Sequence, residues 1–308
     1  MNQNPSSQKV KIYTFSAIAL TSIAIILRII NFVCIFDTEI YYFKNHPLHS
    51  VYQALTTLTV LWLISMLVFI PRQSFTAKIS LTTGVLSRSM GLFCGFTALA
   101  SYFFFRESML YYISHAKLYE TLSLFSLLSA AYFLLLFFEK LPRAIRTLCG
   151  YMTLIWLGLI LSVTYLNLYV PMNSPFKVTL HLAILGMMLH VLEDVRLGVG
   201  RRFRIHYFAY TWIALLFCGL SSFPVLTAYL LDRYPDVDYL FYSLLTLGFF
   251  LYLCTRLFDC YRTLMVTPPA SAQEIEEEKK ASAEKKKEKS PKTPNTVENN
   301  KGDNTHVS

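Results

Sequence analysis

The sequence predicts an all-α membrane protein, a bundle of eight transmembrane helices. Two observations lead to this prediction. The 308-residue chain is 54% hydrophobic and only 15% charged, whereas about a quarter of the residues in a typical soluble domain are charged. The apolar residues also gather into eight runs, each close to the roughly 20 residues that a helix needs to cross a bilayer.

Short polar segments separate the eight runs, and prolines stand at most of their edges, where a missing backbone N–H is tolerated. In order, the predicted spans are Ile12–Ile35, Leu48–Ile70, Leu81–Phe104, Leu118–Phe138, Ile145–Val170, Phe176–Val195, His206–Leu231 and Val237–Tyr261. The first run is too long for a signal sequence and lacks a small-residue cleavage site, so we interpret it as a retained helix. The predicted organisation is a cytoplasmic N-terminus (1–11), a transmembrane domain (12–262) and a polar tail (268–308).

Basic residues predict the orientation of the bundle. With the N-terminus inside, 14 Lys and Arg residues fall in the inner segments and five in the outer segments, leaving aside Arg28 within the first span. Cytoplasmic loops of membrane proteins are enriched in Lys and Arg, so both termini are expected in the cytoplasm. This asymmetry explains the net charge of +9 by membrane orientation rather than by binding to nucleic acid.

The tail after Pro268 has a composition typical of disorder. It contains eight Lys and eight acidic residues and no aromatic residue, so it cannot bury enough apolar surface to fold alone. The alternative is that residues 273–289, in which Glu and Lys recur at helical spacing, form a helix on binding a partner. The partners expected from sequence are therefore the lipid bilayer and a membrane or cytoplasmic protein that contacts the tail.

Four polar residues near the outer ends of two spans are candidate ligand-binding residues. Arg28 and Asn31 share a face of the first span, and Lys177 and His181 share a face of the sixth. Ionisable residues at membrane depth are costly and often functional. For Arg28 the functional interpretation is a contact with an anion or a lipid headgroup, or with an acid such as Asp37, and the alternative is a side chain that snorkels to the interface.

The inner end of the sixth span carries a second polar group, formed by His190, Glu193, Asp194 and Arg196. His190 and Glu193 have the spacing of a helical metal or proton-relay pair, but the nearby inner loops supply basic residues rather than further metal ligands. We interpret the group as an ion-pair network at the inner interface. The i,i+3 spacing of Arg256 and Asp259 predicts another pair in the eighth span.

A stripe of small residues in the third span, Ser87, Gly91 and Gly95, predicts close helix packing, within the chain or in a dimer. The six cysteines are scattered among the apolar runs without a C-x-x-C pair, so we expect neither a disulfide framework nor a metal site. No cofactor is expected either.

The segment Met172-Asn173-Ser174-Pro175, Lys177 and the helix end Glu193-x-x-Arg196 resemble a pattern in uncharacterised multi-spanning membrane proteins of Gram-positive anaerobic bacteria. The resemblance covers Pro171 to about Tyr239. It implies a location in the bacterial cytoplasmic membrane and implies no activity.

These observations favour a non-enzymatic accessory, sensor or scaffold protein. The chain has no Walker A loop and no H-E-x-x-H motif, and the polar residues in its spans do not match the nucleophile and base that an intramembrane protease requires. The alternative function is transport of a small molecule or lipid through an outer polar site that contains Arg28, Lys177 and His181.

Overall fold

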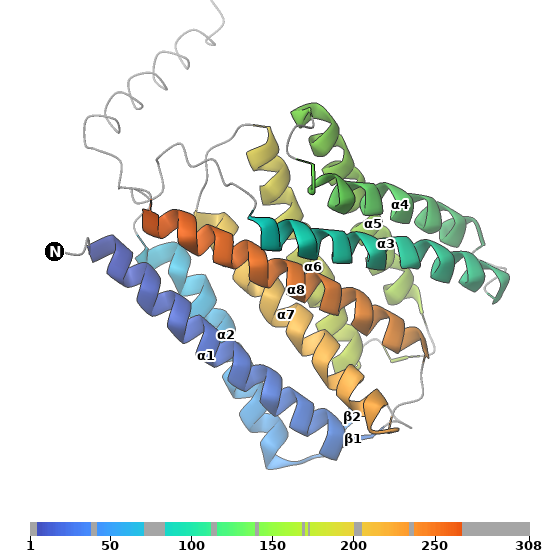
Figure 1. Cartoon of the computed structure of the whole chain (residues 1–308). Helices are drawn as coiled ribbons and strands as arrows, with labels where there is room; N and C mark the ends of the chain where they lie inside the picture. The colour runs from blue at the N-terminus through green and yellow to red at the C-terminus, as the bar shows by residue number, and fades with distance from the viewer. Residues whose placement is uncertain are drawn as a thin grey trace, which may run out of the picture. The chain divides into compact units, whose positions relative to one another are not determined.

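The computed structural model describes residues 5–37, 42–70, 84–111, 116–138, 142–167, 170–171, 173–199, 205–233 and 237–266. These residues form eight helices and two very short strands (Figure 1). In chain order the elements are α1 (Pro5–Cys34), β1 (Phe36–Asp37), β2 (Tyr42–Phe43), α2 (Pro47–Phe69), α3 (Val85–Tyr111), α4 (Ala116–Leu135), α5 (Arg143–Leu166), α6 (Pro175–Gly198), α7 (Ile205–Leu230) and α8 (Val237–Val266).

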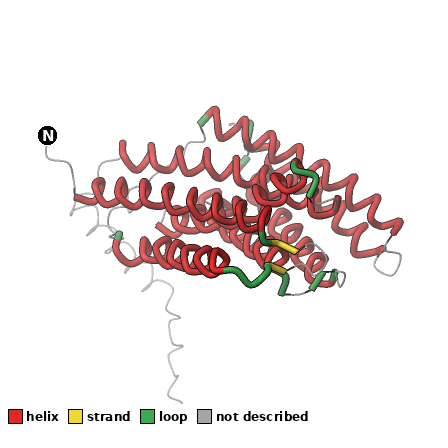
Figure 2. Tube along the Cα trace, turned by 90° about the horizontal axis from the view of Figure 1, so that it is seen from below, coloured by secondary structure: helices red, strands yellow, loops and turns green. Residues whose placement is uncertain are grey.

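The prediction of an all-helical fold is confirmed, with one small addition. β1 and β2 pair in antiparallel fashion directly after α1 (Figure 2), and a pair of two-residue strands leaves no periodic signal in the sequence. The predicted tail, residues 268–308, lies outside the described residues.

Seven of the described helices are long and apolar enough to cross a membrane, namely all except α3. The chain therefore has the helix composition of a multi-pass membrane protein. α3 carries Arg88, Arg106 and Glu107 within its 27 residues, and these charges lower its apolar character. It also begins and ends later than the predicted span Leu81–Phe104. An eighth span through α3 stays a prediction.

The helices from α3 to α8 close a cycle of contacts. Each packs against the next in the sequence, and α8 returns to pack against α3. The α1–α2 pair lies outside this cycle and contacts α7 (Figure 1). As a result α7 has neighbours on several sides, α1, α2, α6 and α8, and most of its side chains are buried.

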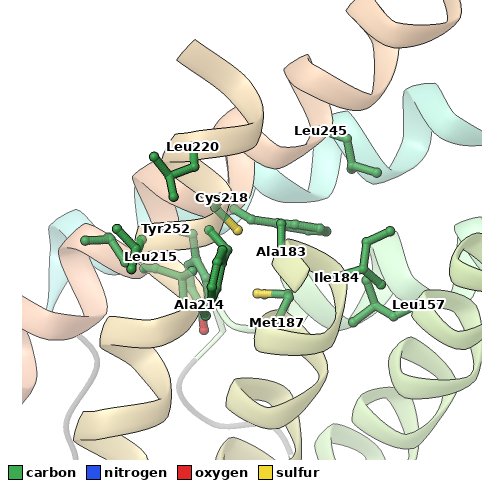
Figure 3. Close-up of a cluster of buried hydrophobic side chains, with 14 of the residues drawn as sticks. Leu157, Ala183, Ile184, Met187, Ala214, Leu215, Cys218, Leu220, Leu245 and Tyr252 are labelled. Carbon is green, nitrogen blue, oxygen red and sulfur yellow. The ribbon is translucent and has the colours of Figure 1, made fainter. Parts of the chain in front are cut away.

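A cluster of buried apolar side chains lies where α6 and α7 meet. Ala183 and Met187 of α6 lie beside Ala214 and Cys218 of α7, and α5 and α8 add further apolar side chains (Figure 3). The two backbones approach closely at Gly186, because a Cβ built on this residue would lie 2.8 Å from the Ala214 Cα. Small residues at a crossing allow helices in membranes to approach and gain van der Waals contact.

Substituting alanine for Gly186 tests this crossing. We expect Gly186→Ala to lower the stability by about 1–3 kcal/mol, because the added methyl group must push α7 away. Gly158→Ala is the matched control, since a Cβ there meets only the Met188 Cε at 4.0 Å, and alanine favours a helix over glycine by about 0.5–1 kcal/mol. Thermal unfolding of both variants in one detergent measures the difference. Equal shifts would contradict the close crossing.

The predicted small-residue stripe faces α4 of the same chain at its two glycines. A Cβ on Gly91 would lie 3.5 Å from the Phe133 carbonyl oxygen, and one on Gly95 would lie 2.9 Å from the Leu134 side chain. Ser87 is also buried. The glycines therefore serve the packing of α3 on α4 within the chain, which is one of the two uses that the stripe predicts.

Candidate functional site

The first candidate site lies where α1 ends and α2 and α6 begin, beside β1 and β2; we call this end of the helices the hairpin end. Local sequence positions both helix starts. α2 and α6 each begin with a proline, which suits the first helical position. The side chains of His46 and Ser174 accept hydrogen bonds from the nitrogens of Leu48 and Lys177, at 3.2 Å each, as N-cap residues do.

Arg28 is the central side chain of this site. It is only 2% exposed, and its Nη2 donates a hydrogen bond of 3.0 Å to the carbonyl oxygen of Pro175. Its guanidinium carbon lies 4.7 Å from the ring centroid of Phe43 and 5.1 Å from that of Tyr52, distances at which a cation is attracted to an aromatic face. The side chain thus points into the protein, which differs from the snorkelling alternative.

Several buried polar atoms around Arg28 have no hydrogen-bond partner among the described residues. They are Arg28 Nε, both amide atoms of Asn31 and Nδ1 of His49. Asn31 lies one turn beyond Arg28 on α1 and is fully buried. Buried polar groups are nearly always hydrogen-bonded in proteins, so these atoms are available to a water molecule or a ligand.

The described carboxylates do not pair with Arg28. Asp37, the acid considered from sequence, lies 3.8 Å from Lys44 Nζ instead. Within the described ranges no ion pair of Arg28 is present, and the neutral Pro175 carbonyl is its hydrogen-bond acceptor.

Lys177 and His181 have their hydrogen bonds with α5, and no described hydrogen bond joins them to Arg28 or Asn31. The Lys177 Nζ donates hydrogen bonds of 3.0 Å and 2.8 Å to the carbonyl oxygens of Tyr165 and Asn167 at the end of α5. The His181 Nε2 lies 3.1 Å from Thr164 Oγ1, also on α5. Both side chains therefore join α6 to α5.

A second polar cluster lies at the opposite end of the helices and joins four of them. We call Tyr132 (α4), Asp194 (α6), Tyr207 (α7) and Arg256 (α8) the Asp194 network. Asp194 Oδ1 accepts a hydrogen bond of 2.7 Å from Arg256 Nη2, and its Oδ2 accepts one of 2.7 Å from the Tyr132 hydroxyl. The Tyr207 hydroxyl accepts from Arg256 Nε at 3.0 Å and lies 3.3 Å from Asp194 Oδ1.

His190 extends this cluster toward Thr211 and Tyr252. Its Nδ1 lies 2.9 Å from Thr211 Oγ1, and that hydroxyl donates its single proton to the Tyr207 carbonyl at 2.5 Å. In the neutral imidazole this arrangement places the proton on the His190 Nδ1 and makes Nε2 an acceptor. Neither Nε2 nor the nearby Tyr252 hydroxyl has a partner among the described residues.

The predicted group of His190, Glu193, Asp194 and Arg196 divides between two sides of α6. Arg196 Nη1 lies 2.5 Å from Glu193 Oε1, and Arg196 is partly exposed, whereas His190 and Asp194 point into the bundle. The basic residues of the inner loop that follows α6, Arg201, Arg202 and Arg204, lie outside the described residues. Within the described ranges, no three His, Cys, Asp or Glu side chains are placed to hold a metal.

The predicted pair of Arg256 and Asp259 is wrong. Arg256 pairs with Asp194 of α6, and Asp259 Oδ2 accepts a hydrogen bond of 2.8 Å from the Gly84 nitrogen. Sequence reasoning also missed Tyr132 and Tyr207. A buried tyrosine in an apolar run carries no local sign of its partner, which here lies 62 residues away for Tyr132.

The helix composition and the buried polar clusters define a polytopic membrane protein with polar side chains buried near both ends of its helices. No protein-family model, curated protein or solved structure matches this chain. The resemblance of residues 171–239 to a bacterial membrane protein family accordingly stays a prediction.

Proposed function

We propose that this chain is a non-enzymatic accessory protein of the cell membrane that senses a ligand at its hairpin end. In this proposal all eight helices span the bilayer and both termini are cytoplasmic. The distribution of 14 inner and five outer basic residues supports this orientation. It places the hairpin end outside and the Asp194 network near the cytoplasm.

The observation that carries the sensor proposal is that α6 is held at both ends by contacts from distant parts of the chain. Arg28 of α1 binds the carbonyl oxygen of Pro175 at its start, and Arg256 of α8 binds Asp194 near its end. These two contacts lie roughly 28 Å apart at a rise of 1.5 Å per residue. A single rigid helix thus links the two polar clusters.

This arrangement supplies a physical route from ligand to response. A ligand that accepts hydrogen bonds from Arg28 competes with the Pro175 carbonyl and releases the start of α6. Any shift of α6 changes the geometry at Asp194, whose ion pair joins α6 to α8. A ligand moves such an equilibrium only by the difference of its affinities for the two states.

The tail is the proposed contact with a protein partner. Its mixed Lys and Glu residues and the basic inner segments suit a charged cytoplasmic partner or the anionic lipid of the inner leaflet. Transport remains the alternative function, with Arg28 near the outer side as part of its site. The two functions differ in whether a protein partner is required.

A crosslinked pull-down from native membranes tests the proposal, comparing the full chain with one that ends at Thr267. We expect one protein partner in fixed stoichiometry with the full chain and its loss from the shortened chain. A full-length variant with residues 273–289 shuffled keeps the length and charge and controls for simple electrostatic binding. Recovery of lipid alone from both chains would contradict the proposal and favour transport, which liposome flux assays would then measure.

A further inference from the structure

The hairpin end contains a buried cation, Arg28, that has few hydrogen-bond partners among the described residues. Among the described residues, two other basic side chains are buried, and both have strong acceptors: Arg256 has the Asp194 carboxylate, and Lys177 has two carbonyl oxygens. Arg28 has a single neutral carbonyl as its hydrogen-bond acceptor among the described residues, and its Nε has no partner. Removing a cation from water is costly unless it is paired and hydrogen-bonded.

Asn31 is the second incomplete group, and it lies on the same face of α1 as Arg28. Its side chain is fully buried, and neither its amide nitrogen nor its amide oxygen has a partner among the described residues. The guanidinium of Arg28 and the amide of Asn31 lie on adjacent turns of α1. Their hydrogen-bonding atoms without a described partner are therefore close enough to contact the same ligand.

Deepening the sensor proposal, on which it rests, we infer that Arg28 and Asn31 bind the anionic oxygens of a carboxylate or a phosphate. The group belongs either to a lipid headgroup or to a free solute. The planar guanidinium presents its N–H groups in a fork that matches both anions. The Asn31 amide nitrogen donates to a further oxygen of the ligand, and its amide oxygen accepts from a ligand hydroxyl.

The surroundings favour an anion over a cation. The rings of Phe43 and Tyr52 pack near the guanidinium carbon of Arg28. A ligand would therefore bind at the edge of the guanidinium, where its N–H groups lie. The positive charge of the Arg28 guanidinium itself attracts an anion and repels a cation. Phe43 packs on Arg28, and its ring centroid lies 4.6 Å from that of His49. Phe43 is only partly buried, so its ring alone separates this side of the guanidinium from the protein surface.

The decisive variant is Asn31→Leu in the full-length protein. It keeps the size of the side chain and removes both unpaired polar atoms. Thr21→Val is the matched control, because Thr21 is also buried on α1 with an unpartnered hydroxyl. Without an added anion, both variants should unfold at a higher temperature than the natural protein, since each loses a buried polar group without a partner.

The test measures thermal unfolding in neutral phosphatidylcholine nanodiscs with added inorganic phosphate or acetate at constant ionic strength, and in nanodiscs that contain phosphatidylglycerol. We expect an anion to stabilise the natural protein and Thr21→Val alike, and Asn31→Leu to need about tenfold more of it, the factor that 1.4 kcal/mol represents. A response to phosphatidylglycerol alone identifies a headgroup, and a response to the soluble anions identifies a free solute.

Three results would overturn the inference: no stabilisation by any of these anions, an equal response of Asn31→Leu and the natural protein, or a lower unfolding temperature of Asn31→Leu without anion. The last would show that Asn31 has a partner in the protein. These outcomes are independent of the pull-down. Anion binding without a protein partner contradicts the sensor function alone, and a partner without anion binding contradicts this inference alone.

Discussion

Arg256→Met is expected to destabilise the protein by about 3–5 kcal/mol, the usual cost of removing one partner from a buried ion pair. Methionine fills much of the space of the arginine, so the loss is electrostatic. In the natural protein the side chains of Arg256 and Asp194 are only 4% and 8% exposed. The substitution would therefore leave the Asp194 carboxylate buried without its cation. The Tyr207 hydroxyl would also lose the hydrogen bond that it accepts from Arg256.

The matched control for this prediction is Arg196→Met. It breaks the Arg196–Glu193 pair, which lies on the same helix as Asp194 and has side chains that are 28% exposed at Arg196 and 9% exposed at Glu193. Because the arginine of this pair is partly solvated, we expect a smaller loss than for Arg256→Met. Thermal and denaturant unfolding in detergent measure both variants. Equal losses would contradict a dominant role of the Asp194 network.

A double variant separates the charge from the packing. Asp194→Asn combined with Arg256→Met removes both charges, and the asparagine amide still offers an oxygen to the Tyr132 hydroxyl. We expect the double variant to lose less stability than Arg256→Met alone, because no uncompensated charge remains. Additive losses from the two single substitutions would indicate that they do not interact.

The helices could be predicted from the sequence because lipid and the protein interior both require the backbone to hydrogen-bond with itself. A backbone in either environment satisfies its polar groups internally as a helix, so long apolar runs identify all eight. Their boundaries follow less exactly. α8 continues to Val266, beyond the predicted Tyr261, because no residue before Pro268 prevents another turn.

The polar sites were only partly predictable, since local spacing governs pairs within one helix and the fold governs the others. Glu193 and Arg196 are neighbours at i,i+3 and do pair. Arg256 has the same spacing to Asp259, yet it points toward α6 and meets Asp194, 62 residues earlier. When a helix is buried on several sides, its polar residues can pair with residues of other helices. The sequence of that helix alone does not identify these partners.

Arg28 shows the same limit. A residue of this type in the first span can reach the interface along its stem, and the sequence contains nothing that opposes this. The carbonyl of Pro175, 147 residues away, and the rings of Phe43 and Tyr52 hold it inside. Only the packing of α1 against α2 and the start of α6 could reveal it.

Lys177→Met is the second substitution with a large expected effect. We expect a loss of about 3–6 kcal/mol, because hydrogen bonds to a charged group contribute roughly 1.5–3 kcal/mol each and two are lost. The carbonyl oxygens of Tyr165 and Asn167, at the end of α5, would lose the cation that satisfies them. A positive charge there also suits the negative end of the helix dipole.

Lys117→Met provides the control, because Lys117 lies at the start of α4 and is exposed; it should change stability by less than about 0.5 kcal/mol. Thermal unfolding of the two variants gives the comparison, and anion titration of Lys177→Met assigns its role. If Lys177 joins α5 to α6, the variant unfolds earlier but retains the anion response of Arg28 and Asn31. Normal stability with a lost anion response would instead make Lys177 a ligand-binding residue.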